Sequence, residues 1–149
     1  MKVEEYDWDD QVSVRLRAAQ QLEIAERYGT TESEPGVPPS AADIAVFFVA
    51  TSVDGEPLGC GGLRYLGGGE AEIKRMYVLP AARGHGVATA ILGHLEDHAR
   101  HLGWLRLKLE TGEQQPDAMR FYEREGYTRI ANFGAYAGVA DSVCYAKDL

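Results

Sequence analysis

Two stretches of the chain space their apolar residues as in an amphipathic helix, three and four positions apart. The first covers residues 11–28, follows Asp10, a residue type that can cap a helix, and stops at Gly29. The second runs from residue 87 to residue 102, with apolar side chains at positions 88, 91, 92, 95, 99 and 102. We therefore predict two long helices, and a third, short helix near residues 117–125.

The remaining apolar residues lie in short β-prone runs. Residues 44–51, 58–65 and 71–78 are separated by turn sequences and predict three consecutive antiparallel strands. Residues 104–110 follow the second helix, so this strand is expected to lie parallel to 71–78. Two final strands are expected near 127–133 and 142–147. The pattern predicts a single α/β domain of the α+β kind over residues 1–149.

Composition and charge narrow the classes of function. Fifteen basic and 23 acidic residues give a net charge of −8, which argues against a nucleic-acid partner. The acidity fits a cationic substrate or simple solubility. No apolar run is long enough to span a membrane, and the two cysteines have no metal-type spacing. We expect a cytoplasmic protein with no membrane partner and no metal site, the histidines at 94, 98 and 101 forming a solvated helix face.

The segment "AARGHGVATA" at 81–90 is the first candidate for chemistry. Gly84 and Gly86 open the second long helix, whose free N–H groups and dipole favour an anion, and Arg83 adds a charged donor. The lysine of a Walker A loop is missing. A dinucleotide fingerprint would need a third glycine where Thr89 stands, although Glu110 sits where a ribose-binding acid could be. A glycine-rich connection without a ligand is the remaining alternative.

Together with its surroundings, the segment resembles the GNAT superfamily of acetyl-CoA-dependent N-acetyltransferases. The resemblance covers roughly residues 44–130. It rests on Arg83-x-x-Gly86-x-Ala88, on the preceding "AEIKRMYVLP", and on "QPDAMRFYEREGY" at 115–127. It implies a mixed, mostly antiparallel sheet in which the parallel strands 71–78 and 104–110 splay apart beside a β-bulge. Acetyl-CoA would be the acetyl donor, with its pantetheine arm in that notch.

The resemblance also assigns binding residues. Main-chain groups of the segment Met76, Tyr77 and Val78 would bind the pantetheine arm, with the Val78 N–H as donor to the oxyanion. Gln115 stands where the family usually has Asn, and its amide would also reach the arm. The pyrophosphate would be cradled by the amides of Arg83, Gly84, His85, Gly86, Val87, Ala88 and Thr89.

Acetyl transfer to an amine needs a base and, for the leaving thiolate, an acid. Glu72 is the candidate base, because a carboxylate is unexpected on a covered strand; an ion pair with Lys74 is the alternative. Tyr122 is the candidate acid, with packing beside Phe121 as the alternative. A non-catalytic acyl-CoA-binding module is the second hypothesis for the whole protein.

The acceptor is left open by the sequence. Lys74 and Arg75 are consecutive in a strand, so we expect them to point to opposite faces, one of them toward the acceptor and able to bind a substrate carboxylate. The polar stretch "TTESEPGVPPSAAD", which ends at Asp43, is either a solvated loop or a flap over the substrate. The acceptor could be a small amine, amino acid, antibiotic, peptide or protein lysine, and a homodimer is possible.

Overall fold

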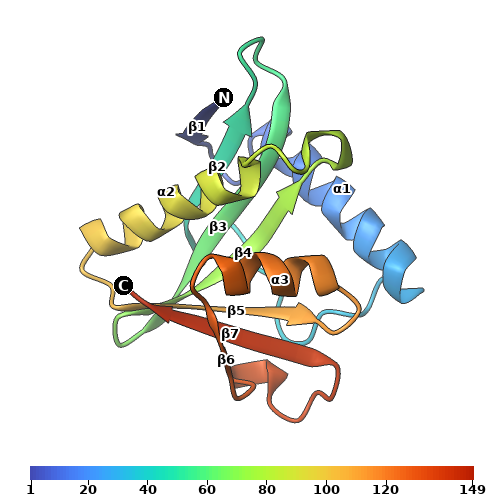
Figure 1. Ribbon diagram of the computed structural model, residues 1–149, viewed down its shortest axis with the longest axis vertical. Coiled ribbons are helices and arrows are strands. Elements are labelled where there is room, and N and C mark those ends of the chain that lie inside the picture. The colour runs from blue at the N-terminus through green and yellow to red at the C-terminus, as the bar shows by residue number, and fades with distance from the viewer.

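The computed structural model describes residues 1–149 as one seven-stranded sheet with three α-helices (Figure 1). The strands lie in the order β1-β2-β3-β4-β5-β7-β6. The strands are β1 (Lys2–Glu5), β2 (Ile44–Thr51), β3 (Pro57–Gly67), β4 (Glu70–Val78), β5 (Arg106–Gly112), β6 (Thr128–Ile130) and β7 (Ser142–Asp148). The helices are α1 (Gln11–Tyr28), α2 (Val87–His101) and α3 (Pro116–Arg124), with short 3₁₀ turns at Pro80–Ala82 and Gly134–Tyr136.

The predicted elements are present, with two informative differences. The short, charged strand β1 was not predicted, because "KVEE" has no apolar alternation; it forms at the sheet edge by pairing with β2. Strand β5 begins and ends two residues later than predicted. Trp104 instead stacks on Tyr65, with ring centroids 4.7 Å apart, and pairing with β7 continues to Gly112. Glu110 therefore lies inside a strand rather than at its end.

The predicted parallel pair is confirmed, and it is short. Strands β4 and β5 pair only over Glu70–Arg106, Ala71–Leu107 and Glu72–Lys108. Beyond these three pairs the strands separate, and Figure 1 shows β5 running away from β4 toward the C-terminal end of α1. All other neighbours in the sheet are antiparallel. The mixed, mostly antiparallel sheet with splayed central strands is thus as predicted.

Two apolar layers hold the helices on opposite faces of the sheet. The larger core has 17 buried residues and joins α2 and α3 to one face, with Ile91, Leu92 and Leu95 fully covered. The smaller core joins α1 to the other face through Leu16, which packs on Phe47. None of the helices has the length and apolar character needed to cross a membrane. The separation of β4 and β5 thus has α1 on one face of the sheet and α3 on the other.

Strand β4 contains a bulge next to the point where the strands separate. Its pairing with β3 shifts between Lys74 and Tyr77, so that one residue more is used on β4 than on β3. Arg75 has φ of 59°, the one non-glycine residue with a positive φ. Such a conformation costs about 1–3 kcal/mol and is typical of functional positions. The bulge turns the end of β4 relative to its beginning.

Candidate active site

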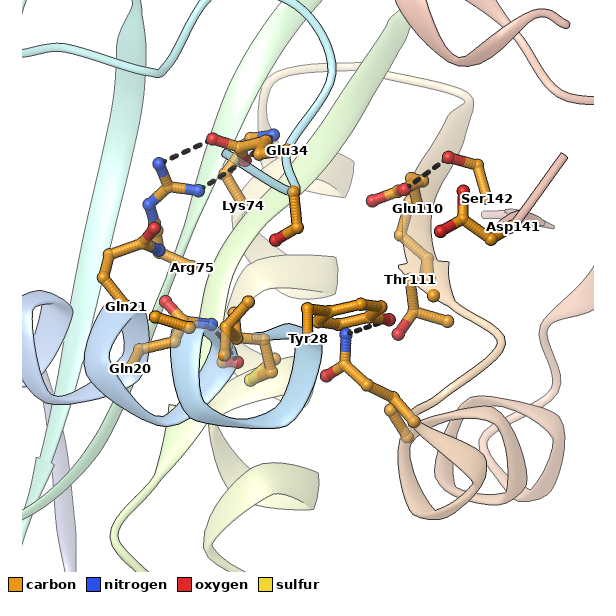
Figure 2. A pocket seen from close by; sticks show the side chains of 18 of the residues that line it. Gln20, Gln21, Tyr28, Glu34, Lys74, Arg75, Glu110, Thr111, Asp141 and Ser142 are labelled. Carbon is orange, nitrogen blue, oxygen red and sulfur yellow. Dashed lines mark hydrogen bonds and ion pairs between the residues drawn. The ribbon is translucent and has the colours of Figure 1, made fainter. Parts of the chain in front are cut away.

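A polar cavity of about 130 Å³ lies where β4 and β5 separate. Its walls come from the bulged part of β4, the end of β5, the C-terminal half of α1, the loop after α1, and α3 (Figure 2). The polar residues used below are Gln20, Tyr28, Glu34, Lys74, Arg75, Glu110, Gln115, Tyr122 and Ser142. Because the backbone edges of β4 and β5 are unpaired here, the cavity can bind an extended ligand as well as side-chain partners.

Glu110 is the carboxyl group in this cavity whose pKa departs most from its ordinary value. Its Oε2 accepts a hydrogen bond of 2.7 Å from the Ser142 hydroxyl. Burial raises the pKa of Glu110 to about 7. This effect outweighs the Ser142 hydrogen bond and the charge of Lys74, which both lower the pKa. A carboxyl group with such a pKa can take a proton at neutral pH and return it to solvent. Glu110 can therefore act as a general base.

Lys74 and Arg75 both face the acidic side chain of Glu34, contrary to the expectation that they point apart. Arg75 donates two hydrogen bonds to the two carboxylate oxygens, at 2.6 and 3.0 Å, and Lys74 Nζ lies 3.0 Å from Oε2. The left-handed backbone at Arg75 breaks the alternation of the strand, which is the reason for the difference. Burial raises the pKa of Glu34, but its bonds and charges with the two cations outweigh this and hold the pKa below its ordinary value.

Glu72 is buried, with 3% of its surface exposed, and lies among charged and polar partners. Tyr136 donates a short hydrogen bond to its Oε2, and Lys74 Nζ lies 3.6 Å from the same oxygen. Arg64 approaches Oε1 at 4.0 Å. The ion pair with Lys74 that the sequence offered as an alternative is therefore formed. Glu72 itself does not line the cavity, and its predicted catalytic role stays a prediction.

Tyr122 reaches the cavity from α3 with a hydroxyl that makes no hydrogen bond within the protein. Its ring packs edge-on against Phe121 and Tyr127, with centroids 5.0 and 5.7 Å away. Burial raises the pKa of Tyr122, so the phenol keeps its proton at neutral pH. The packing beside Phe121 is therefore formed and the hydroxyl is available to a ligand, while the role of Tyr122 as acid stays a prediction.

Helix α1 closes one end of the cavity with Tyr28. The Tyr28 hydroxyl lies against the β5 backbone, where a Cβ added to Gly112 would be 1.6 Å away. The predicted pantetheine contact Gln115 stands at the N-terminal boundary of α3, and its side-chain Nε2 lies 3.5 Å from that hydroxyl. A side chain at position 112 would therefore have to displace the Tyr28 ring. Gln115 thus lies at the cavity, as its predicted role needs.

The glycine turn before α2 has the form of an anion cradle. The backbone N–H groups of residues 84–89 have no acceptor within the protein, whereas the Arg83 N–H bonds to the Pro80 carbonyl at 3.3 Å. Gly84 and Gly86 both have φ of 80°, and nothing lies within 4 Å of a Cβ built on either. Six of the seven predicted amides are therefore available to a bound anion.

The side chains of this turn are engaged differently from the prediction. Arg83 pairs with both oxygens of Glu23, at 2.8 and 2.9 Å, and donates from Nε to the Val78 carbonyl. The Thr89 hydroxyl donates to Glu125. His85 lies near the Ala82 carbonyl, with 3.4 Å between Nδ1 and the oxygen. The main chain of the turn, rather than the Arg83 charge, is thus what a phosphate would meet.

The open edge of β4 carries the groups predicted to bind an extended arm. The Leu79 N–H donates a hydrogen bond to the Leu58 carbonyl on β3. Successive N–H groups of a strand point to opposite sides, so the Val78 N–H points away from β3 and toward the gap. The Met76 carbonyl accepts a hydrogen bond of 2.9 Å from Gln20 Nε2. The other amide atom, Gln20 Oε1, is buried without a partner. An unpaired buried oxygen at the cavity wall fits a site for a ligand that carries N–H donors, as the amides of pantetheine do.

The sequence did not predict the roles that three residues have in this site. Glu110 was weighed only as a possible ribose-binding acid, and Gln20 was not weighed at all. Glu34 was weighed as an acid near the acceptor that would favour an amine or as simple surface charge, but not as a partner of Lys74 and Arg75. Glu34 lies 40 positions before Lys74, and Gln20 lies 56 before Met76, so no local pattern connects these residues. Only the packing of α1 and its following loop against β4 brings them together.

Neither the cysteines nor the histidines form a second centre. Burial raises the pKa of the Cys60 thiol to about 12, and burial also raises that of Cys144, so both stay protonated. His94 and His98 lie edge-on to the Phe48 ring, at 5.5 and 6.0 Å. No group of three or more metal-type side chains is present.

Comparison with known proteins gives consistent matches. A model of the acetyltransferase (GNAT) family matches residues 6–127. The IAA acetyltransferase of Azospirillum brasilense is 37% identical over 90 residues, covering 60% of this chain and 59% of that protein. The amino-acid acetyltransferase of Mycobacterium tuberculosis is 35% identical over 105 residues, covering 69% and 58%. The chain therefore spans less than two thirds of the length of these relatives.

Solved structures agree with the fold. A Klebsiella pneumoniae protein provisionally named an acyl-CoA N-acyltransferase has a TM-score of 0.83 and 30% identity, covering 99% of this chain and 97% of that one. An N-acetyltransferase of Thermoplasma acidophilum, solved with coenzyme A, has a TM-score of 0.71 over the full length of both chains. Its identity is 16%, so this second likeness concerns the fold alone.

Proposed function

Because the chain belongs to the acetyltransferase (GNAT) family, we propose that it moves the acetyl group of acetyl-CoA to an amine by direct attack in a ternary complex. Acetyl-CoA is the donor that this family uses. The observation that carries the proposal is the cavity at the separation of β4 and β5, which is lined by both an ionisable carboxyl group, Glu110, and a free phenol, Tyr122. No covalent intermediate on the protein is required.

The donor is assigned to the open edge of β4 and the turn after it. The free N–H groups of residues 84–89 bind the pyrophosphate, and the Val78 N–H faces the gap in which the thioester would lie. Gln20 and Gln115 border the same gap and offer amide groups to the pantetheine arm. Arg83 contributes by fixing the turn against α1 through Glu23, rather than by its free charge.

The reaction forms one C–N bond and breaks one C–S bond. Glu110 takes one proton from the acceptor's ammonium group and later releases it to solvent. The nitrogen of the resulting neutral amine attacks the thioester carbon, and the developing oxyanion accepts a hydrogen bond from the Val78 N–H. The Tyr122 hydroxyl donates a hydrogen bond to the departing thiolate and passes its proton to it, so that coenzyme A leaves as the thiol. The second proton of the attacking nitrogen is lost to solvent, from which the phenol regains its proton. Burial of Tyr122 weakens it as an acid, so its hydrogen bond contributes before complete proton transfer.

Two carboxylates compete for the role of base, and the cavity favours Glu110. Glu110 lines the cavity, whereas Glu72 is held by Tyr136 and Lys74. With a pKa of about 7 for Glu110, kcat at saturating acceptor should rise tenfold per pH unit below 7 and level off above it. Glu110→Gln should remove this rise and lower kcat at pH 8 by roughly 10²- to 10⁴-fold. If Glu72→Gln removes the rise and Glu110→Gln leaves it, Glu72 is the base.

The first experiment is a thermal-shift titration with acetyl-CoA, coenzyme A, NADH and ATP. A ligand present at 100 times its dissociation constant stabilises the fold by about 2.7 kcal/mol, a clear shift in Tm. We expect stabilisation by acetyl-CoA and not by NADH. A panel of amines with release of the coenzyme A thiol as readout then tests turnover.

The outcomes separate the two hypotheses for the protein. Binding of acetyl-CoA together with acceptor-dependent thiol release supports the transferase. Binding without turnover on any amine would indicate an acyl-CoA-binding module instead. Stabilisation by NADH and none by acetyl-CoA would reject the assignment of the glycine turn altogether.

A further inference from the structure

We infer that the acceptor amine also carries a carboxylate, and that this carboxylate binds Arg75 and Lys74 after displacing Glu34. The inference rests on the proposed function and specifies the substrate class for the same cavity. It starts from an unusual arrangement. A carboxylate from the chain itself occupies two cations that a bulge in β4 has turned to one side.

Arg75 has the geometry of a carboxylate receptor. Its two terminal nitrogens bind the two Glu34 oxygens in parallel, and 11% of its side chain is exposed. This forked contact suits the planar guanidinium and gives directional as well as electrostatic selection. Glu34 is its one ion-pair partner, so a half-open cavity would hold an unpaired guanidinium if Glu34 simply left. A second anion must take the vacated position, because an uncompensated buried charge is costly.

Lys74 supports the same position without depending on Glu34. Its ammonium lies 3.0 Å from Glu34 but also 3.1 Å from the Tyr136 hydroxyl and 3.6 Å from Glu72. When Glu34 moves away, Lys74 therefore stays fixed by these two partners. It adds a second positive charge beside the Arg75 fork. The pair is a preformed site for one carboxylate.

Glu34 is held in a way that allows exchange. It lies in the segment between α1 and β2, which has no helix or strand, and 27% of its side chain is exposed. Between Ser33 and Val37 the backbone makes one hydrogen bond to the rest of the protein, from Arg64 to the Val37 carbonyl. Replacing Glu34 by a substrate carboxylate keeps the number of charges and of hydrogen bonds. The exchange therefore costs little beyond the movement of the loop.

The cavity also fixes the direction and size of the acceptor. Figure 2 shows Glu110 across the cavity from the ion pair of Glu34 and Arg75. An acceptor whose carboxylate binds Arg75 can thus direct its amine toward Glu110. With Glu34 in place the cavity has a volume of about 130 Å³, and the departure of Glu34 adds the space of one side chain; sites for drug-sized ligands measure roughly 300–1,000 Å³. These features fit a small amino acid rather than a polypeptide or a large antibiotic.

The test compares matched acceptors with the wild-type protein. Each of the twenty L-amino acids is assayed for acetyl-CoA-dependent acetylation beside its carboxamide and its decarboxylated amine. For the preferred side chain, we expect kcat/KM of the acid to exceed that of the two analogues without a carboxylate by roughly 10- to 100-fold, the size of one charge-assisted contact. Equal values for the three forms would overturn the inference and leave the transferase intact. Thiol release with other amines but with none of these compounds would also overturn the inference, whereas thiol release with no amine at all would reject the proposed function itself.

Three variants test the exchange with Glu34. Glu34→Gln should lower KM for the acid by about tenfold, because its competitor loses its charge, and should change the amide little. Arg75→Gln should remove the preference for the acid. The matched control is Glu32→Gln, which removes the same charge from an exposed position of the same loop outside the cavity. If KM for the acid rises in Glu34→Gln and not in Glu32→Gln, Glu34 binds the acceptor and the exchange is overturned. This comparison needs only the Glu34→Gln variant, its control and the wild type, so it holds even if Arg75→Gln does not fold.

Discussion

Replacing Glu110 by glutamine should change the unfolding free energy relative to wild type in a pH-dependent way. The difference between variant and wild type should favour the variant more at pH 8 than at pH 5. In the folded protein burial raises the pKa of Glu110 to about 7, against an ordinary value of 4.5. The folded state thus holds this proton more tightly than the unfolded chain. Its contribution to stability is complete below pH 4.5 and is lost as the pH rises to about 7.

The size of the effect follows from the two pKa values. One pKa unit corresponds to about 1.4 kcal/mol, so the part of the shift that falls between pH 5 and pH 8 amounts to about 2 to 3 kcal/mol. Glutamine cannot titrate, yet its amide oxygen can still accept the Ser142 hydrogen bond. The difference in unfolding free energy between Glu110→Gln and wild type should therefore increase by about 2 to 3 kcal/mol over this range.

Urea denaturation of both proteins at pH 5 and pH 8 measures this difference. With the slope of about 1–3 kcal/mol per molar typical of small proteins, the relative midpoint should move by about 1 to 2 M. Glu113→Gln is the control, because it removes the same charge from an exposed residue nearby. A difference that is the same at both pH values would refute a buried, neutral Glu110 and would remove the main support for its role as base.

Two further predictions concern the ends of the cavity. Tyr122→Phe should lower kcat by roughly 10²-fold while calorimetry finds the acetyl-CoA affinity unchanged, because the hydroxyl acts on the leaving sulfur; a wild-type kcat would dismiss the acid. Gly112→Ala should destabilise the fold by about 1–3 kcal/mol, since the new methyl group would meet the Tyr28 hydroxyl. Adding Tyr28→Phe should recover part of that loss in thermal unfolding, and no recovery would show that another contact is responsible.

Much of the fold could be read from local patterns. Helix α1 and strand β2 have the predicted bounds, because continuous apolar periodicity between polar segments specifies an element without reference to its neighbours. The parallel crossover from β4 to β5 followed from the order of strand, helix and strand. Strand β1 was missed and β5 was shifted, because both depend on a partner strand distant in the sequence.

The candidate site also has parts that the local sequence predicted and parts that depend on residues distant in the chain. The anion turn was predictable, since its amides are freed by the helix start and two glycines inside one short segment. The position of Tyr122 at the cavity also followed from its motif. The predicted base Glu72 was a reasonable choice from a covered strand, but whether a buried carboxylate meets a cavity or an ion pair depends on the residues packed against it.

The sequence by itself determined the three helices, most of the strands with their order, and the glycine turn with its free amides, because each depends on residues close together in the chain. The tertiary structure decided the chemistry of the cavity. A bulge with one left-handed residue turned Arg75 to the side of Lys74, and the loop after α1 supplied Glu34 to both. The splay of β5 set Glu110 at a half-buried position in the cavity, and this burial raises its pKa to about 7. Burial and charge are sums over neighbours in space, so neither can be read along the chain.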